Sequence, residues 1–466
     1  MRLFNTLKEK CQIRLSKSFD SALFSWREIF EIYLPIVGDQ IFIYVIGLLN
    51  TSMVSSSGQD SVAAMSLANP LSSMIFAIFN AIAAGATVVM AQYQGHGDRA
   101  LTRRSAGQVI VAVFFIGALS CIATAFAAEP LIRLLYRDIG EAVILKSRDY
   151  LIGVGISLLF HSFYMGVFAV LRGVGDSATC LKLSVIINLT HLFFSVIFIN
   201  VLHLDILGTA LSLIVARIIG GACAMYSVMR KKAQIRVLFS DLFRFDFAVH
   251  RAVWKVGLPF SWEQVFANGG TLLVQTFLVS FGEMGVAANA IANSVFSLVY
   301  MAGAGVSTLA ITVVGQCVGA GERALAKSYG KKMMHMATGI NLLSMLVFLP
   351  AMPLVLALFN APSDTVDLIW HLLLIAVGAM PFFWSASGIL PGVLRAAGDS
   401  AFVSNASLIL MWVARVGAAW VFCFPLHLGV YGIWISMVFE WVLRTVVFSL
   451  RFRGQRWLGK RSLIEP

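Results

Sequence analysis

Two carboxylates in this sequence stand inside long apolar stretches, where an ionisable side chain is costly. Asp39 and Glu263 each follow a proline by four residues. Because a charge in hydrocarbon is expensive, both are functional candidates by default. Such a carboxyl group could bind and release a proton, or it could attract Na⁺ or an organic cation. The alternative is structural, with hydrogen bonds to Gln40, Gln264 or nearby backbone that fix the helix packing.

Further polar and aromatic residues in the same stretches could line a wet cavity or hold helices together. The amides are Asn50, Asn69, Asn188, Gln275 and Asn293. His161 could relay protons, since histidine titrates near pH ~6.5, or it could simply be packed in the core. Tyr44 could contribute a ring to a wall that binds organic cations, or it could serve packing.

The composition indicates what kind of element carries these residues. The chain has 466 residues, of which 59% are hydrophobic and 12% are charged. Soluble domains carry roughly a quarter charged residues, so this surface does not suit water. Stretches 105–128 and 333–363 contain no Asp, Glu, Lys or Arg. A membrane span needs roughly 20 apolar residues, and long unbroken runs favour helices over barrel strands.

We therefore predict an all-α integral membrane protein with about twelve transmembrane helices. The expected spans are 29–54, 62–90, 106–127, 149–171, 182–200, 207–229, 253–280, 286–315, 333–357, 368–394, 402–424 and 429–450.

The placement of positive charge predicts the orientation of these spans. Most of the 35 Lys and Arg residues fall in the N-terminal tail, in alternate connections, in the stretch 230–255 and at the C-terminal end. The opposite connections hold only Arg133, Arg137, Lys146 and Arg148. Positive loops stay cytoplasmic, so we expect both termini inside, in the inner (plasma) membrane of the cell. Topology and anionic lipid explain the net charge of +12, so we expect no nucleic-acid partner.

An internal repeat divides the chain into two halves. The matched segments recur in the same order, about 224 residues apart: 34–40 with 258–264, 62–69 with 286–293, 92–98 with 316–322, and 170–177 with 393–400. Each half holds an even number of spans. We therefore expect two parallel, pseudo-symmetric six-helix bundles related by an axis along the membrane normal.

These features predict five regions in the chain. They are a cytoplasmic N-terminal segment (1–28), a first six-helix bundle (29–229), a cytoplasmic linker (230–252), a second six-helix bundle (253–450) and a cytoplasmic C-terminal tail (451–466). The linker mixes phenylalanines with charged residues, which is typical of an amphipathic helix at a membrane interface.

The repeated motifs resemble those of the multidrug and toxic compound extrusion family, a branch of the multidrug/oligosaccharidyl-lipid/polysaccharide flippase superfamily. The motifs that carry the resemblance are Leu49-Asn50-Thr51-Ser52-Met53, Ala91-Gln92-Tyr93-Gln94-Gly95, Leu171-Arg172-Gly173-Val174-Gly175-Asp176, Val314-Gly315-Gln316 and Leu394-Arg395-Ala396-Ala397-Gly398-Asp399. The resemblance covers roughly residues 25–455. It implies two bundles in a V that rock between inward-open and outward-open states, and export of organic, often cationic, compounds driven by H⁺ or Na⁺ entry.

The sequence departs from the family pattern at two acidic positions. Many members have an Asp near the end of the first span, where this chain has Asn50. Many also have a Glu about two turns into the seventh span, where this chain has the uncharged stretch 266–268. The shared acidic position of the two halves, Asp39 with Glu263, therefore replaces these sites as the expected place of ion coupling, and Na⁺ could bind at either residue.

The preferred function is secondary active efflux of organic, cationic compounds by H⁺ or Na⁺ antiport, performed by a monomer in the lipid bilayer. One alternative is a flippase for a lipid-linked or polyanionic precursor, but only Arg217 and Arg415 lie deep enough to meet a pyrophosphate. Another is a non-transporting receptor or scaffold. The sequence has no G-x-x-x-x-G-K-[ST] phosphate loop and no HExxH motif, so we expect no enzyme activity and no cofactor beyond the coupling ion.

Overall fold

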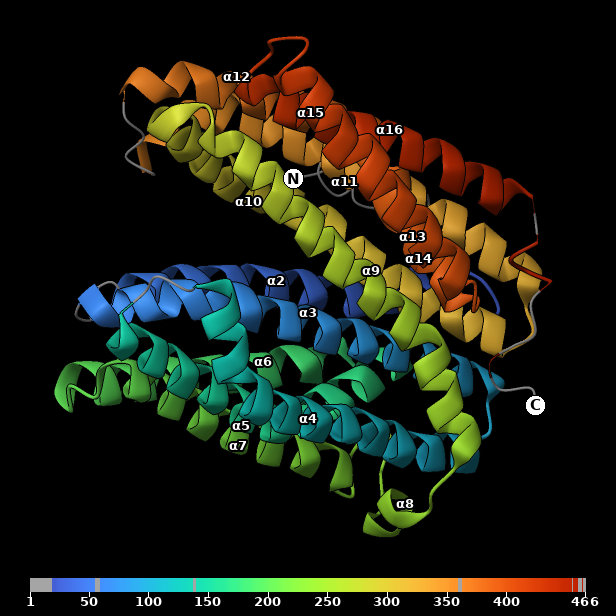
Figure 1. The fold of residues 1–466 in the computed structure, drawn as a ribbon. Helices are drawn as coiled ribbons and strands as arrows, with labels where there is room; N and C mark the ends of the chain where they lie inside the picture. Colours follow the sequence, from blue (N-terminus) through green and yellow to red (C-terminus); the bar gives the residue numbers. More distant parts are fainter. Residues whose placement is uncertain are drawn as a thin grey trace, which may run out of the picture. The chain divides into compact units, whose positions relative to one another are not determined.

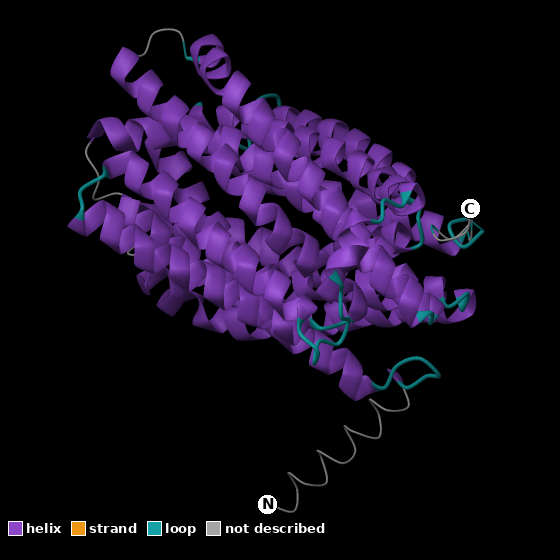
Figure 2. Ribbon diagram, turned by 90° about the horizontal axis from the view of Figure 1, so that it is seen from below, coloured by secondary structure: helices purple, strands orange, loops and turns teal. Residues whose placement is uncertain are grey.

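The computed structural model of the chain describes residues 19–54, 59–136, 140–358, 363–454, 456–459 and 463, and these residues form helices joined by short loops (Figures 1 and 2). The first group of helices is α2 (Trp26–Val54), α3 (Gln59–His96), α4 (Arg99–Leu135), α5 (Glu141–Val174), α6 (Ser177–Ser195), η1 (Val196–Val201) and α7 (Asp205–Met229). The linker contains α8 (Phe239–Phe243). The second group is α9 (Phe247–Val279), α10 (Gly282–Gly319), α11 (Arg323–Leu358), α12 (Ser363–Ala379), η2 (Met380–Trp384), α13 (Ser385–Ala396), α14 (Ser400–Leu410), η3 (Met411–Gly417), α15 (Ala418–Cys423) and α16 (Val430–Arg453).

The predicted all-α membrane fold is confirmed, and every predicted span lies on a described helical segment. Eleven of these segments are long and apolar enough to cross a membrane. The predicted span at 253–280 lies on α9, which has 33 residues but does not reach the same apolar character. Its polar residues Glu263, Gln264, Asn268 and Gln275 explain the difference.

Three of the spans contain short π-helical segments, which the sequence pattern did not predict. They are η1, η2 and η3, and each directly follows an α-helix with no residue between them. Pro381 is the second residue of η2, and proline lacks the N–H that an α-helical ladder needs. Such π-turns widen a helix locally and often occur beside functional sites. The predicted span at 368–394 is thus built from α12, η2 and α13.

Equivalent turns of the two halves have equivalent backbone conformations, which confirms the repeat at the level of structure. Gly97 and Gly321 have φ angles of 84° and 77°, and Gly175 and Gly398 have φ angles of 91° and 86°. Only glycine adopts this left-handed region at low cost, so the Gly-Asp and Gly-Glu turns require it. Asp98 caps the next helix by accepting hydrogen bonds from the backbone N–H groups of Ala100 and Leu101, and these bonds lower the pKa of Asp98.

The turns before the last helix of each half repeat in the same way. His203 and His427 have φ angles of 50° and 52°, which are unusual for residues with a side chain. The backbone N–H of Leu204 donates to the Phe198 carbonyl, and that of Leu428 donates to the Phe422 carbonyl. The two halves therefore share loop geometry as well as helix order.

Contacts within the chain divide it into two compact units. One unit is Gly38–Gln264, and the other combines Met1–Val37 with Val265–Glu465. One division falls inside α2, between residues 37 and 38, and the other inside α9, between residues 264 and 265. Each follows a proline of the same helix, Pro35 or Pro259. The predicted boundaries, at residues 229 and 253, instead separate the two sequence copies. Each of these helices thus gives its first part to one unit and its second part to the other.

Specific contacts fix these exchanged helix parts in their units. Within Met1–Val37 and Val265–Glu465, the Tyr33 hydroxyl donates to the Ala302 carbonyl at 2.9 Å, and Ile29 is fully buried in the core cluster. Within Gly38–Gln264, the Ser261 hydroxyl donates to the Ile78 carbonyl at 3.2 Å. A Cβ on Gly85 would lie 2.8 Å from the Gly257 backbone, so these helices touch through small residues.

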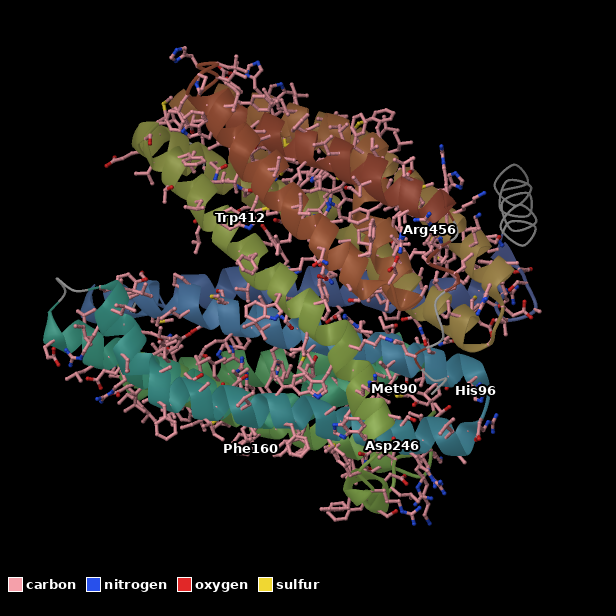
Figure 3. All side chains as sticks on the ribbon, turned by 45° about the vertical axis from the view of Figure 1, so that its right-hand side comes forward. Met90, His96, Phe160, Asp246, Trp412 and Arg456 are labelled. Atoms are coloured by element: carbon pink, nitrogen blue, oxygen red, sulfur yellow. The ribbon has the colours of Figure 1, made fainter. Side chains whose placement is uncertain are left out.

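Helix packing inside Gly38–Gln264 also depends on small residues. A Cβ on Gly153 of α5 would lie 2.6 Å from the Ala210 Cβ of α7. A Cβ on Gly173 of α5 would lie 2.5 Å from the Cβ of Met90 on α3, a residue labelled in Figure 3. Close approach of this kind is how helices associate in lipid, where no hydrophobic effect draws them together. These contacts hold α3, α5 and α7 around the candidate site.

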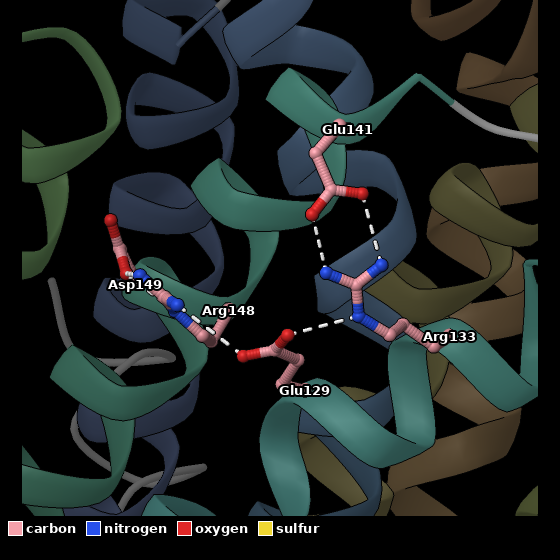
Figure 4. Close-up of polar contacts among 5 residues, drawn as sticks. All are labelled: Glu129, Arg133, Glu141, Arg148 and Asp149. Carbon is pink, nitrogen blue, oxygen red and sulfur yellow. Dashed lines mark hydrogen bonds and ion pairs between the residues drawn. The ribbon is translucent and has the colours of Figure 1, made fainter.

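The end of α4 and the start of α5 carry a network of five charged side chains (Figure 4). Arg133 binds both Glu129, at 2.9 Å, and Glu141. Arg148 binds Glu129 at 3.3 Å and Asp149 at 2.8 Å. Two of the few basic residues predicted on this side are therefore balanced by three carboxylates. Exposed pairs add little stability, but they remove positive charge from this end of the unit.

Candidate functional site

A cavity of about 390 Å³ lies inside the unit Gly38–Gln264. Side chains from α2, α3, α5, α6 and α7 line it: Asp39, Gln40, Ile43, Asn80, His161, Tyr164, Met165, Phe168, Arg172, Ser184, Ile187, Asn188, His191, Leu213, Ala216 and Arg217. The structure thus brings together four of the predicted site residues, Asp39, Gln40, His161 and Asn188. Their roles stay predictions.

Asp39 is the carboxylate of this cavity, and its side chain is only 2% exposed. Its Oδ2 atom forms an ion pair with a guanidinium nitrogen of Arg172 at 3.0 Å. Its Oδ1 atom is buried and has no hydrogen-bond partner among the described residues. A buried ion pair is sensitive to any competing charge, because removing one partner leaves the other unbalanced in a medium of low dielectric constant. One face of the carboxylate therefore remains able to accept a proton or a cation.

A continuous stack of rings on α5 forms one wall of the cavity. The rings of His161 and Tyr164 stack with centroids 5.3 Å apart, and those of Tyr164 and Phe168 also lie 5.3 Å apart. The Arg172 guanidinium covers the far end, 4.2 Å from the Phe168 ring. The stack uses positions three and four residues apart, which share one face of a helix. It ends at the ion pair with Asp39, so aromatic surface and negative charge are adjacent.

Arg217 brings a second positive charge to the cavity. It is 7% exposed, donates a hydrogen bond to the Ser157 hydroxyl and lies 4.7 Å from the centre of the Phe76 ring. The structure records no ion pair between Arg217 and any described carboxylate, so Arg217 is not the counter-charge of Asp39. Arg172 has that place instead. A cation that is held only by a hydroxyl and a ring face keeps most of its charge available to a ligand.

A second cavity, of about 500 Å³, lies in the unit that contains Val265–Glu465. Its polar lining includes the predicted residues Gln275 and Asn293, together with Asn289 and Arg415. The Trp434 indole N–H donates to the Asn289 side-chain oxygen at 3.0 Å. The amides of α9 and α10 therefore face a common space, and their role stays a prediction.

Glu440 balances the deep arginine of this second cavity. Its carboxylate lies 3.6 Å from Arg415 and 3.2 Å from Arg444. Glu440 is 5% exposed, and Arg444 also donates to the Ser407 hydroxyl. A buried carboxylate shared by two guanidinium groups is a fixed packing element, and we expect it to hold η3 against α16.

The remaining predicted residues lie outside these two cavities. Glu263 is 6% exposed on α9, and Gln264 follows it, but neither lines the cavities described above. Tyr44 is partly buried on α2, and Asn69 is exposed on α3. The side chain of Asn50 lies outside the described residues. No group of three or more His, Cys, Asp or Glu side chains that could hold a metal ion occurs in the described part of the chain.

Sequence reasoning missed Arg172 as a site residue and named it only as part of a repeated motif. It also left Asn80 out of the site. The internal repeat contained a usable indication. The first copy has Asp39 and Arg172, and the second has Glu263 and Arg395, at nearly the same separation. An acid and an arginine that recur together in both halves are expected partners, and the pair in the first copy is the one described above.

Comparison with known proteins gives consistent results over nearly the whole chain. The chain is 24% identical to the "Uncharacterized transporter YisQ" of Bacillus subtilis, over 93% of this chain and 95% of that protein. It is also 24% identical to the "Probable multidrug resistance protein NorM" of Thermotoga maritima, with 94% of each chain covered.

Solved structures show the same fold. A structure described as the outward-facing conformation of a multidrug resistance MATE family transporter of the MOP superfamily matches with a TM-score of 0.83. The match covers 92% of this chain and 95% of that one, at 20% identity. Another, described as MATE in the bent conformation, matches with a TM-score of 0.82 at 20% identity.

The MatE family model matches the chain twice, at residues 35–197 and 259–421. The two matches begin and end 224 residues apart, which is the spacing of the internal repeat. They also start at Pro35 and Pro259, the prolines that precede the two acidic positions. Together the matches cover well over half of the sequence, and the chain therefore belongs to the MatE family of multidrug and toxic compound extrusion transporters.

Proposed function

We propose that this protein exports organic compounds, mainly aromatic cations, by antiport with H⁺ or Na⁺. The observation that carries the proposal is the buried Asp39 at the end of the ring stack in the first cavity. Ring faces attract organic cations, and a carboxylate fixes their charge. Relatives such as the NorM protein of Thermotoga maritima are named as probable multidrug resistance proteins, which supports the same substrate class.

Competition at Asp39 gives the exchange its chemical basis. In the ionised form the carboxylate attracts the substrate cation, which competes with Arg172 for the same negative charge. When a proton binds an Asp39 oxygen, the carboxyl group becomes neutral and the attraction for both cations falls. The substrate then leaves, and loss of the proton on the other side restores the ion pair with Arg172. One proton or Na⁺ moves against each unit of substrate charge held there.

The position of Asp39 on α2 suggests how this exchange is linked to alternating access. Asp39 lies two residues beyond the point where α2 passes from one compact unit into the other. Pro35 leaves a backbone carbonyl without its usual helical donor just before this point, which favours bending. We propose that ion binding at Asp39 changes the preferred bend of α2 and so favours one of the two access states.

Na⁺ is an alternative to the proton at this position. The cavity contains oxygens suited to a hard cation, from the Asp39 carboxylate, the Ser184 hydroxyl and the Asn188 amide. The Asn188 side chain already donates to the Ser184 carbonyl at 2.8 Å, which leaves its oxygen available. Proton coupling needs Asp39 alone, whereas Na⁺ coupling needs these neutral oxygens as well.

We further propose that the protein acts as a monomer in the inner (plasma) membrane with both termini in the cytoplasm. The ion network of Figure 4 supports this orientation, because it removes net positive charge from the side predicted to face outward. A flippase for lipid-linked precursors is not favoured, since the matched relatives carry multidrug resistance names.

Transport in proteoliposomes tests the proposal directly. The purified protein is reconstituted, and efflux of a fluorescent aromatic cation such as ethidium is followed under a pH gradient or a Na⁺ gradient imposed separately. We expect one of the two gradients to drive transport of the dye and the other to have no effect. Absence of transport under both gradients, across a panel of cationic dyes, would refute the proposed antiport.

A further inference from the structure

Arg217 of α7 is a buried cation to which the proposed exchange at Asp39 gives no role. It is 7% exposed and lines the cavity of the unit Gly38–Gln264. Its recorded contacts are the hydrogen bond to the Ser157 hydroxyl and the contact with the Phe76 ring. No carboxylate forms an ion pair with it in the part of the chain that the structure describes. An ion taken out of water without a counter-charge is costly, and neither of these contacts neutralises it.

The surroundings of Arg217 hold its guanidinium group in place. The Ser157 hydroxyl accepts from Arg217 and donates to the Val154 carbonyl at 2.5 Å, so its orientation on α5 is fixed. One turn further along α7, a Cβ on Gly221 would lie 2.8 Å from the carbonyl oxygen of Phe160, a residue labelled in Figure 3. This close contact between α5 and α7 leaves little room for rotation of α7. The charge therefore stays directed at the cavity.

The side chains that line this cavity do not balance in charge. Its fixed charges are one carboxylate, Asp39, and two guanidinium groups, Arg172 and Arg217. Asp39 is paired with Arg172 at 3.0 Å, so the charge of Arg217 is left over whenever Asp39 is ionised. Asn80 adds an amide whose side chain has no recorded hydrogen bond to the described residues. One monovalent anion would neutralise the lining, and Asn80 offers it a neutral donor.

The second half of the chain neutralises its own deep arginine in a different way. There the Glu440 carboxylate of α16 lies 3.6 Å from Arg415. Position 440 corresponds to position 216 of α7, 224 residues earlier, and the same spacing relates Ser436 to Ser212. Position 216 holds Ala216, which is 1% exposed and lines the cavity beside Arg217. The first half thus has a methyl group where the second half has the carboxylate.

We propose that Arg217 binds a monovalent anion inside this cavity, either a free inorganic ion such as chloride or the carboxylate of an organic molecule. A guanidinium group donates charge-assisted hydrogen bonds and binds a planar carboxylate through two N–H groups at once. The bound anion supplies the counter-charge that Glu440 supplies in the second half. The site uses a charge that the Asp39 ion pair does not involve, and it does not depend on the coupling ion.

Binding to the purified full-length protein in a neutral detergent tests this site. The melting temperature and the dissociation constant are measured with sodium chloride and, separately, with sodium benzoate, against sodium sulfate at equal ionic strength. We expect at least one of the two monovalent anions to stabilise the wild type. Arg217→Gln should bind that anion about tenfold more weakly or worse, which is about 1.4 kcal/mol.

A second pair of variants keeps Arg217 and changes the charge beside it. Ala216→Glu places a carboxylate at the position that corresponds to Glu440 and makes the lining neutral. Ala216→Gln adds a side chain of the same size without the charge. Ala216→Glu should therefore bind the anion about tenfold more weakly than Ala216→Gln does. This comparison holds even if Arg217→Gln fails to fold.

Arg230→Gln is the matched control, because Arg230 directly follows the last residue of α7 and is exposed. It should bind the anion as the wild type does. Stabilisation by chloride alone identifies a free inorganic ion, and stabilisation by benzoate alone identifies an organic carboxylate. Equal affinity of the wild type and a folded Arg217→Gln would overturn the proposal, as would equal affinity of Ala216→Glu and Ala216→Gln. Failure of both monovalent anions to bind the wild type would overturn it as well.

Discussion

At the residue scale, the central feature is that Asp39 is paired with Arg172 and not with Arg217. The 3.0 Å ion pair makes the cavity locally neutral when no ligand is present, while Arg217 adds a positive charge at the other side. In the proposed mechanism, selectivity depends on how strongly a ligand competes with Arg172. A ligand with a cationic group and aromatic rings can replace the guanidinium against both the carboxylate and the Phe168 ring.

The variant Asp39→Asn should abolish ion-coupled export while the protein remains folded in the membrane. The amide has nearly the shape of the carboxylate but cannot exchange a proton or bind a cation strongly, so we expect efflux to fall on the order of tenfold or more. Dye accumulation in a pump-deficient host, normalised to protein level, measures this. Asp149→Asn, at an exposed ion pair, serves as the control. Normal efflux from both Asp39→Asn and Glu263→Gln would show that these carboxylates are structural.

The variant Arg172→Gln should destabilise the protein more than the double variant Asp39→Asn/Arg172→Gln does. Removal of the guanidinium alone leaves a buried carboxylate without its counter-charge, at a cost of about 3–5 kcal/mol, whereas removal of both charges leaves two neutral polar groups. Thermal unfolding of the purified variants in one detergent, completed as a double-mutant cycle, gives the coupling. Additive effects of the two substitutions would contradict a direct interaction.

At the element scale, the helices could be predicted from the sequence, but their partners could not. Runs of apolar residues located all the spans, because bilayer thickness fixes their length. The internal repeat predicted that equivalent helices follow one another in the same order in both halves. To predict the cavity, one would need the contacts between α2, α5, α6 and α7. These contacts depend on how small residues pack, and hydrophobic periodicity alone does not specify this packing. For this reason Asp39 could be identified from the sequence as a costly charge, while its partner Arg172 could not.

The variant Gly153→Leu should weaken the packing of α5 against α7, since even one added carbon at this position would lie 2.6 Å from the Ala210 Cβ. Overpacking of this kind costs typically 1–3 kcal/mol. We expect a lower melting temperature and weaker substrate binding, because α5 carries the ring stack. Gly339→Leu on α11, where a Cβ would meet nothing within 4 Å, should leave both unchanged. Equal melting temperatures of the two variants would show that the α5–α7 contact is not tight.

At the scale of the whole molecule, charge asymmetry and the repeat together define the topology. From the repeat we expect each half to run in the same direction through the membrane, and equivalent turns recur with similar backbone angles. The ion network at the α4–α5 turn uses Glu129, Glu141 and Asp149 to balance two of the basic residues on that side. Positive charge is therefore concentrated on the other side even more strongly than residue counts indicate.

Fusion of a reporter that is active only in the cytoplasm to either end should report the same orientation. Green fluorescent protein at the N-terminus or at the C-terminus should fluoresce, because both termini are expected inside. Alkaline phosphatase inserted between residues 137 and 139 should be active, since this connection is expected outside. Fluorescence from one terminus and not from the other would mean an odd number of spans.

The passage of α2 and α9 through both compact units has a consequence for the history and assembly of the protein. If the chain were cut in the linker and the halves were made as two polypeptides, neither would contain a complete unit, because each lacks the start of one helix that the other supplies. The halves would have to exchange arms, as the subunits of a domain-swapped dimer do. An ancestor with only one copy of the repeat could therefore have functioned only as a dimer. Today's two halves, expressed together as separate polypeptides, should recover function that neither half shows alone.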